Sequence, residues 1–424
     1  MKIGLINIGN ELLNGQTLNS HHQWIARQAT GQGWILDHQQ TITDSPEAIV
    51  NAIDTAIGVH DLVIATGGLG PTSDDITRDV VAKYFQVSLE PDKAVELGIR
   101  EYFARRKRPM PESVLVQAMV PAGAEVLFNH FGTAPGLVMR HREKGGWLAM
   151  LPGPPRELYP MFTDQLVPFI RKMLVSEVGY YCRVLRTVGI GESRVQELIE
   201  SELAGMVEQG LEIGYCARTG EVDVRLATRK SDGSNDVDAA VETVRRILGS
   251  AVFAEGEDSL EKTVVGSLIT SQLTVATAES CTGGFLGHRL TMVPGASEVY
   301  LGGAITYSNA EKIRQLGVDP GTLDKLGAVS EEVARQMAEG IRRVTGADFG
   351  LSTTGIAGPG GGSDEKPVGL VYMAVAGPGR TEVFHRINTF DRETFKFVTT
   401  QQVLDCLRRM VDGCSLENMR PGNI

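Results

Sequence analysis

The feature that most restricts the fold of this chain is an alternation between short apolar runs and stretches with helical periodicity. The runs end in glycine or serine, and they stand at residues 3–9 (IGLINIG), 61–68 (DLVIATGG), 274–280 (TVATAES) and 349–355 (FGLSTTG). Runs of this length that are rich in β-branched residues predict buried strands, and intervening helices allow such strands to lie parallel. The chain is therefore predicted to fold as an α/β protein.

The pattern changes twice along the chain, which indicates more than one domain. From about residue 175 short alternating strands dominate, and the segment AEGEDS (254–259) has the composition of a linker that ends in a helix cap. A new α/β pattern follows it. Because 424 residues exceed the size of one hydrophobic core, we predict an α/β domain at 1–172, a small α+β domain at 173–254 and a second α/β domain at 255–424.

Composition excludes several classes of protein. The net charge of −11 disfavours a protein that coats nucleic acid or an anionic membrane, because affinity for phosphate backbones comes from Lys and Arg. The five cysteines are odd in number and widely spaced, which predicts neither a disulfide framework nor a zinc site. The sequence has no apolar stretch of about 18 residues. We therefore expect a cytoplasmic protein that binds neither membrane nor nucleic acid.

The segment AESCTGG (278–284) places Ser280 between a predicted strand and a predicted helix. Open α/β sheets bind ligands at the carboxyl ends of their strands, and amides at a helix N-terminus can hold an oxyanion. A serine hydroxyl is a weak nucleophile unless a base takes its proton. Ser280 taken alone fits a helix cap better, but the motifs elsewhere in the same domain favour a nucleophile.

The segment YSNAEK (307–312) supplies the base that such a serine needs. If a helix starts at Ser308, Tyr307 and Lys312 lie about one turn apart and both reach the strand-end cleft. A lysine buried beside apolar walls gives up its proton more readily, and no histidine is placed by a motif near Ser280. We predict that Lys312 is the base and that Tyr307 relays or stabilises the proton.

Two neighbours of Ser280 have competing interpretations. Cys281 is interpreted as a small packed thiol rather than as the nucleophile. Glu279 either orients Lys312 or pairs with it at the surface.

A third segment, TTGIAGPGGG (353–362), is a glycine-rich strand exit that allows close approach of a phosphate or a ring. Together with AESCTGG, YSNAEK and the following KPVG, it resembles the C-terminal domain of the CinA family, the nicotinamide-nucleotide amidases. The resemblance covers about residues 257–415. It implies hydrolysis of nicotinamide mononucleotide to the nicotinate nucleotide and ammonia, with no metal or other cofactor.

The family resemblance also assigns roles to individual residues. It implies that Ser280, Lys312 and Tyr307 are catalytic. The substrate-binding set that it implies is Cys281, Thr282, Gly283, Thr354, Gly355, Gly358 and Arg392. One departure is visible, because Lys396 stands where the family is expected to have a second arginine, and a lysine cannot bind an anion in a bidentate manner.

The segment TGGLGPTSDDIT (66–77) joins a predicted strand to a helix through a glycine-rich turn whose amides can cradle an anion. The glycines concerned are Gly67, Gly68 and Gly70. Asp74 and Asp75 can hold a divalent ion against a phosphate, and PGPPRE (152–157) brings Glu157 to the same edge. These acids predict a metal site suited to pyrophosphate chemistry. The alternative is a helix start in which Asp74 is the cap and Asp75 complements the dipole.

These segments are similar to the molybdopterin-binding fold at the N-terminus of full-length CinA proteins, over about residues 1–170. The resemblance implies metal-dependent hydrolysis of ADP-ribose to AMP and ribose 5-phosphate. The middle segment resembles the KH-like domain of the family. It has no G-x-x-G clamp, and acidic residues outnumber basic ones over residues 172–246, so RNA binding is not predicted.

The sequence thus predicts a bifunctional enzyme of pyridine-nucleotide salvage whose partners are two small nucleotides, nicotinamide mononucleotide and ADP-ribose. The family resemblance also implies a homodimer. Two alternatives stay open. One is a competence-linked regulatory protein in which one or both sites are vestigial, and the other is an amidase whose N-terminal domain binds molybdopterin.

Overall fold

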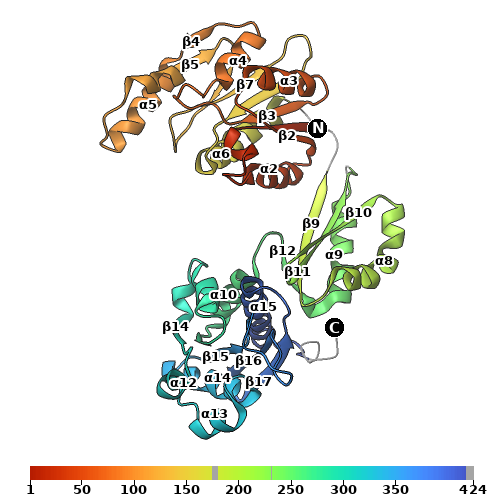
Figure 1. Ribbon diagram of the computed structural model, residues 1–424. Helices are drawn as coiled ribbons and strands as arrows, with labels where there is room; N and C mark the ends of the chain where they lie inside the picture. The colour runs from red at the N-terminus through yellow and green to blue at the C-terminus, as the bar shows by residue number, and fades with distance from the viewer. Residues whose placement is uncertain (174–179, 231, 417–424) are drawn as a thin grey trace. The chain divides into compact units, whose positions relative to one another are not determined.

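The computed structural model describes residues 1–173, 180–230 and 232–416. It divides into two compact units, Met1–Tyr180 and Tyr181–Ile424 (Figure 1). Within these residues no helix is both long and apolar enough to cross a membrane. Both units combine sheets with covering helices, so the predicted α/β class is confirmed.

The first unit is built around a six-stranded sheet in the order β2-β1-β3-β8-β7-β6. The first four of these strands are parallel, and β7 and β6 extend the sheet antiparallel. A separate two-stranded ribbon pairs β4 with β5. The strands are β1 (Lys2–Ile8), β2 (Ile35–Ile42), β3 (Leu62–Thr66), β4 (Leu89–Pro91), β5 (Met119–Pro121), β6 (Glu125–Leu127), β7 (Gly136–Arg140) and β8 (Trp147–Leu151).

Helices cover both faces of this sheet (Figure 1). Ile6 and Ile8 of β1 pack in a core shared with α3 and α4, whereas Ile3 and Leu5 pack in a second core with α2, α6 and α7. The alternation of side chains along a strand therefore produces three layers. The helices are α1 (Asn10–Leu13), α2 (Ser20–Gly31), α3 (Pro46–Ile57), α4 (Thr77–Tyr84), α5 (Lys93–Arg105), the 3-10 helix Glu112–Ala118, α6 (Pro155–Met161) and α7 (Val167–Met173).

Two prolines shape the helical segment that follows β8. Pro155 stands in the first turn of α6, where its missing N–H costs nothing, and Pro160 lies inside the helix. The chain then passes through one π-helical turn, Phe162–Leu166, before α7 begins. Pro160 lacks the N–H that an inner helical residue donates, and the widened turn two residues later keeps the helical path continuous into α7.

The second unit begins with the small α+β fold that the alternating pattern predicts. Its antiparallel sheet has the order β10-β11-β9-β12, and two helices pack against it around Val195, Ile199 and Val244. The elements are β9 (Tyr181–Val188), α8 (Glu192–Glu208), β10 (Leu211–Arg218), β11 (Glu221–Thr228), α9 (Ser234–Leu248), the 3-10 turn Gly249–Ala251 and β12 (Val252–Glu255).

The remainder of this unit contains a five-stranded sheet in the order β14-β13-β15-β16-β17. β13 is parallel to both of its neighbours, and β16 and β17 are antiparallel additions. The strands are β13 (Val275–Glu279), β14 (Tyr300–Ile305), β15 (Phe349–Gly355), β16 (Leu370–Gly377) and β17 (Arg380–Ile387). Because the three parallel strands point the same way, the segments that follow them meet at one edge of the sheet.

Helices cover both faces of this second sheet as well. α10, α11 and α15 share one core, which includes Leu286 and Phe395, and α12, α13 and α14 share the other, which includes Leu316 and Met337. The helices are α10 (Leu260–Ser271), α11 (Phe285–Thr291), the 3-10 turn Ala296–Glu298, α12 (Asn309–Leu316), α13 (Pro320–Leu326), α14 (Glu331–Thr345) and α15 (Arg392–Val411).

Candidate active site

Three polar segments meet at the edge where the parallel strands of the C-terminal sheet end. Ser280 follows β13, Thr306 follows β14, and β15 ends at Gly355. The Thr306 amide donates to the Glu279 carbonyl at 2.8 Å, and the Ser280 amide donates to the Thr353 carbonyl at 3.0 Å. The three motifs, far apart in the sequence, are thus held side by side.

The side chains of Ser280 and Lys312 are in contact at this edge. Lys312 Nζ lies 3.1 Å from Ser280 Oγ. The same nitrogen donates to the carbonyl oxygen of Thr306 at 2.8 Å and to that of Tyr307 at 3.5 Å. The Ser308 hydroxyl caps α12, as the sequence predicts, and this start of the helix places Lys312 in its first turn.

Lys312 is buried without a counter-ion. It is 1% exposed, and among the described residues no carboxylate forms an ion pair with it. Burial lowers the pKa of Lys312 from its ordinary value, because the charged form loses its hydration. A neutral amine that donates hydrogens to two carbonyl oxygens keeps its lone pair for the serine hydroxyl. The geometry is that of a general base beside a nucleophile.

Glu279 has a role that neither of its two interpretations from the sequence included. Its carboxylate is 1% exposed and accepts four hydrogen bonds from the loop and helix that follow it. The donors are the Thr282 hydroxyl at 2.7 Å and the amides of Gly284, Leu286 and Gly287 at 2.9, 3.0 and 2.8 Å. Glu279 therefore fixes the loop that carries Ser280 and caps α11, and it forms no contact with Lys312 in the described structure.

Glu279→Gln should loosen this loop and slow catalysis. In a glutamine side chain an NH₂ group replaces one carboxylate oxygen that accepts a hydrogen bond from a backbone amide. That buried amide then loses its acceptor, and two donors face each other. We expect the free energy of unfolding to fall by about 2 kcal/mol and kcat for the proposed amide hydrolysis to fall by about tenfold or more, since small displacements of a nucleophile are costly.

Thermal unfolding and steady-state kinetics test this role for Glu279. The matched control is Glu311→Gln, which removes an exposed carboxylate paired with Arg314 on α12 and should change stability by less than about 0.5 kcal/mol. Substrate KM should change little in Glu279→Gln, because the loop positions the nucleophile. A variant with wild-type kcat and wild-type stability would contradict the role.

The amides that can hold an oxyanion differ from those expected. α11 begins only at Phe285, and its first amides are already bonded to Glu279. Within the described structure the amides of Cys281 and Thr282 have no acceptor, and they directly follow Ser280. Burial raises the pKa of the Cys281 thiol to about 12, which disfavours the reactive thiolate and is consistent with a packed thiol.

Arg392 connects two of the predicted segments. Its guanidinium donates to the Gly358 carbonyl at 2.9 Å and to the Tyr307 hydroxyl at 3.1 Å. The Tyr307 side chain is 62% exposed, and only its backbone carbonyl contacts Lys312 among the contacts of the described residues. A proton relay through the Tyr307 hydroxyl therefore lacks a hydrogen bond to the lysine here and stays a prediction.

The other predicted substrate contacts lie at the same edge, but several have structural partners. The Thr282 hydroxyl is one of the four groups that donate to the Glu279 carboxylate, a set of hydrogen bonds that we call the Glu279 clamp. The Thr354 hydroxyl donates to the Ala328 carbonyl at 2.7 Å. Gly283 has a positive φ of 61°, and a Cβ at this position would stand 3.9 Å from Lys396 Nζ. Because these hydroxyls already have structural partners, we expect backbone groups to provide most of the contacts with a substrate here.

The first unit contains a second candidate site around its glycine-rich turn. Gly67 and Gly68 have positive φ values of 99° and 67°. A Cβ would collide with the Ile8 carbonyl at Gly67, with the Thr77 hydroxyl at Gly68 and with a neighbouring carboxylate at Gly70. The turn lines a cavity of about 560 Å³ at the carboxyl ends of the parallel strands, where the sequence predicts an anion site.

The three acids predicted to bind a metal line this cavity without converging. Asp75 Oδ2 accepts from the amide of Thr72 at 3.0 Å and from its hydroxyl, and Glu157 Oε2 accepts from Asn129 at 2.8 Å. Asp74 is exposed. In the part of the chain that the structure describes, no group of three or more His, Cys, Asp or Glu side chains is placed to hold a metal ion. The residues as arranged do not fit the predicted site, and we assign no chemical step to a metal.

Two buried polar groups that lie at these sites were not identified from the sequence. Gln117 is 2% exposed and lines the same cavity; its Nε2 donates to the Leu69 carbonyl at 3.0 Å, while its Oε1 has no partner among the described residues. The fully buried hydroxyl of Thr306 also lacks one. Buried polar groups normally have partners. Thr306 stands at a strand exit and could have been found from that signal, whereas nothing in the sequence marks Gln117.

Comparisons with known families divide the chain into three matches. Residues 4–172 match the model described as "Probable molybdopterin binding domain". Residues 182–254 match "Damage-inducible protein CinA KH domain", and residues 257–411 match "CinA C-terminal domain".

Whole-length relatives give a consistent result. The chain is 41% identical over 412 residues to the "Putative competence-damage inducible protein" of Moorella thermoacetica, which covers 96% of this chain and 98% of the relative. It is 40% identical over 412 residues to the "CinA-like protein" of Kosmotoga olearia, with the same coverage. The crystal structure of the competence/damage inducible protein CihA from Agrobacterium tumefaciens is 38% identical, covers 37% of this chain and 97% of that chain, and has a TM-score of 0.35.

Proposed function

The chain belongs to the CinA family, and from this premise we propose that its C-terminal domain is a serine amidohydrolase acting on nicotinamide mononucleotide. The products are nicotinate mononucleotide and ammonia. The observation that carries the proposal is the 3.1 Å contact between Ser280 Oγ and a buried lysine without a counter-ion. A structural serine would not need a base whose charged form is disfavoured by burial.

The reaction follows from the placement of these groups. Neutral Lys312 takes the proton of Ser280 as Oγ attacks the carboxamide carbon, and the amides of Cys281 and Thr282 stabilise the oxyanion. The lysine ammonium then gives its proton to the leaving nitrogen, which departs as ammonia and leaves an acyl ester on Ser280. Lys312 next deprotonates a water molecule, which attacks the ester. Collapse of the second oxyanion expels Ser280 Oγ, which takes its proton back from the Lys312 ammonium, and the released carboxylic acid loses its proton to solvent and leaves as the carboxylate.

Arg392 is the proposed contact for the substrate phosphate. It is exposed, and its hydrogen bonds to Gly358 and Tyr307 leave further donors of the guanidinium for a ligand. Its bonds to Gly358 and Tyr307 hold the arginine across the mouth of the site, between the glycine-rich segment and the segment after β14. The ring of the substrate would then lie between Arg392 and Ser280.

The direct test is ammonia release from nicotinamide mononucleotide by the purified full-length chain. The expected result is one ammonia per nicotinate nucleotide formed, at the same rate with and without a chelator, because no step involves a metal. Absence of turnover would favour the alternative of a regulatory protein whose catalytic groups are vestigial.

For the N-terminal domain we propose hydrolysis of the pyrophosphate of ADP-ribose to AMP and ribose 5-phosphate. Support comes from a cavity whose walls are a glycine-rich turn and several carboxylates. The Gln117 Oε1 atom, which lacks a partner in the described structure, is available to a ligand there.

Metal dependence of this second activity is implied by the family resemblance alone, because the three carboxylates as arranged do not converge on one point. Addition of a chelator is expected to stop ADP-ribose cleavage and to leave amide hydrolysis unchanged. Measuring both activities in one preparation provides the control. Equal loss of both would contradict the assignment of the metal to one domain, and tight binding of molybdopterin without ADP-ribose cleavage would favour the other alternative.

A further inference from the structure

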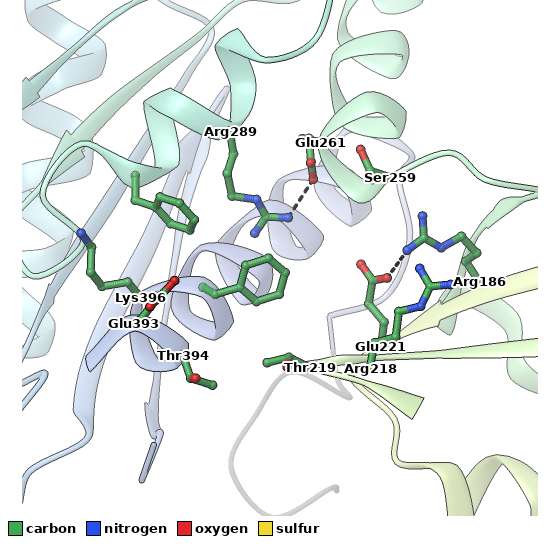
Figure 2. Close-up of a pocket in the computed structure, with 12 residues that line it drawn as sticks. Arg186, Arg218, Thr219, Glu221, Ser259, Glu261, Arg289, Glu393, Thr394 and Lys396 are labelled. Carbon is green, nitrogen blue, oxygen red and sulfur yellow. Dashed lines mark hydrogen bonds and ion pairs between the residues drawn. The ribbon is translucent and has the colours of Figure 1, made fainter. Parts of the chain in front are cut away.

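A cavity separate from the Ser280 edge lies where the β10–β11 hairpin approaches α10, α11 and α15 (Figure 2). Its volume is about 680 Å³, which is within the range of small-molecule sites. Residues from both halves of the second unit line it, including Arg218 and Thr219 from the hairpin and Phe285, Lys396 and Phe397 from the amidase domain. None of Ser280, Lys312 and Tyr307 is among the lining residues.

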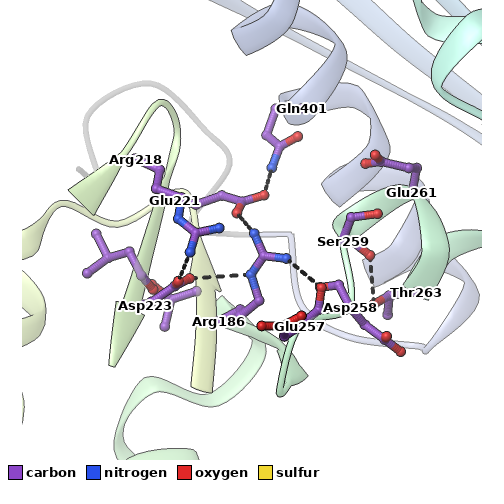
Figure 3. A network of polar contacts seen from close by, with 12 residues as sticks. Arg186, Arg218, Glu221, Asp223, Glu257, Asp258, Ser259, Glu261, Thr263 and Gln401 are labelled. Carbon is purple, nitrogen blue, oxygen red and sulfur yellow. Dashed lines mark hydrogen bonds and ion pairs between the residues drawn. The ribbon is translucent and has the colours of Figure 1, made fainter. Parts of the chain in front are cut away.

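One wall of this cavity is held by a buried polar network (Figure 3). Arg186 pairs with Glu221 and with Asp223, and it also donates to the Asp258 carbonyl at 2.8 Å. Glu221 in turn accepts from Gln401 of α15, so the network joins the two halves of the unit. Such satisfied networks are rigid because each broken contact would leave a buried polar group unpaired. The wall is therefore preorganised.

The cations that line the cavity differ in whether they already pair with a carboxylate. Arg289 pairs with Glu261 at 2.8 Å, and Arg218 pairs with Asp223 at 2.5 Å while remaining 39% exposed in its side chain. Lys396 has no carboxylate partner among the residues that the structure describes, where its ammonium lies against a phenyl ring. The cavity therefore holds one ammonium that is free to pair with an anion and a half-exposed guanidinium at its rim, beside one carboxylate, Glu393, that has no ion pair among the described residues.

Two phenyl rings line the same cavity, and each has a cation against it. Lys396 Nζ lies 5.7 Å from the centroid of Phe285, and Arg289 Cζ lies 4.7 Å from that of Phe397. Neither ring is fully buried. Partly exposed aromatic rings offer a surface on which the base of a nucleotide can stack. Thr219, Ser259 and Thr394 also line the cavity. The Ser259 hydroxyl accepts from the Lys262 amide and the Thr394 hydroxyl donates to Asp391 at 2.6 Å, and each keeps capacity for one further hydrogen bond to a sugar.

We propose that this cavity binds a nucleoside monophosphate at a site that includes Lys396, a position where the family resemblance implies an anion contact, but none of Ser280, Lys312 and Tyr307. The base stacks on the phenyl rings, and the phosphate pairs with Lys396 and Arg218. The volume, the single unpaired ammonium and the hydroxyls together favour a ligand with a planar ring, a sugar and one anionic group. An inorganic anion would use only one of these features.

The position of the cavity couples it to the loop that carries Ser280. Phe285 is the first residue of α11, which Glu279 caps, and Lys396 approaches Gly283 of the same loop. A bound nucleotide would contact both residues. Its contacts with the hairpin would at the same time join the middle domain to the amidase domain.

Photolabelling of the full chain with 8-azido-AMP tests the location of the site. After digestion, mass spectrometry is expected to find adducts in the segments that contain Thr219, Phe285 or Phe397. Unlabelled AMP should compete at least tenfold better than adenosine or ribose 5-phosphate. Adenosine lacks the phosphate and ribose 5-phosphate lacks the base, so each compound uses only part of the cavity. Labels confined to residues 1–180, or equal competition by ribose 5-phosphate, would overturn the proposal.

Thr219→Trp provides the blocking variant, because Thr219 is an exposed turn residue with negative φ, outside the catalytic machinery. It should reduce labelling of these segments at least tenfold and leave turnover of nicotinamide mononucleotide unchanged. Thr219→Ser is the matched control and should label like the wild type. Phe397→Leu repeats the test without altering the turn, and its labelling should also fall by about tenfold. Wild-type labelling of both Thr219→Trp and Phe397→Leu would contradict the site.

Discussion

Ser280→Ala is expected to abolish ammonia release from nicotinamide mononucleotide while leaving the fold intact. The variant removes the atom that forms the acyl ester, and loss of a covalent nucleophile typically costs several orders of magnitude in kcat. Among the described residues the Ser280 side chain has one hydrogen-bond partner, Lys312, so the free energy of unfolding should change by no more than about 1 kcal/mol. Ammonia release and thermal unfolding, measured on the same preparation, separate the two effects.

The control for this serine is a serine whose role is structural. Ser45 caps α3 in the first unit, where its hydroxyl accepts from the Ala48 amide at 3.3 Å. Ser45→Ala should lose about 1 kcal/mol of stability and no amidase activity. If Ser280→Ala instead behaves like Ser45→Ala, Ser280 is a structural residue and an activated water would have to be the attacking group.

Lys312→Arg and Lys312→Met should both be inactive, and wild-type activity should rise with pH through one ionisation. The reason is that only neutral Lys312 can accept the serine proton, and burial lowers its pKa toward the working range. Arginine keeps the charge but does not deprotonate in proteins. Rate measurements across a range of pH, with binding of nicotinamide mononucleotide measured separately, distinguish a base from an electrostatic anchor. An active Lys312→Arg enzyme would rule out the base.

The same lysine makes a prediction about stability. Its pKa in the folded protein is lower than in the unfolded chain, so between the two values the folded state binds fewer protons. The free energy of unfolding therefore rises with pH across this window, and the penalty for burying the group is fully present below it. Lys312→Met lacks the group. Relative to that variant, the wild type should gain stability as the pH increases, which urea unfolding at several pH values can measure.

Much of the amidase site could be predicted because its signals are local. Ser280, Thr306 and Gly355 each follow a strand, and parallel strands bring such positions to one edge whatever the separation in sequence. The cap at Ser308 set the register of α12 and hence the place of Lys312. These predictions depend on turn and cap chemistry, which a short stretch of sequence contains.

The parts that could not be predicted depend on which partner a side chain selects. The sequence suggested that Glu279 interacts with Lys312. In the structure Glu279 accepts hydrogen bonds from the loop that follows it, because a buried carboxylate is stabilised by several fixed donors. Asp75 and Glu157 likewise bond to Thr72 and Asn129 rather than converging. Spacing in sequence shows which acids can approach one another but not which donor each one finally meets.

The Glu279 clamp also bears on how the site assembles and fails. All four of its hydrogen bonds join residues no more than eight positions apart, whereas the contact between Lys312 and Ser280 spans 32. Closing a short loop costs less chain entropy than closing a long one, so the nucleophile loop can take its shape early in folding and the base arrives later. On heating, the order reverses. A local opening that lifts α12 from the sheet would separate base from nucleophile while residues 279–287 keep their conformation, and activity would be lost before the domain melts.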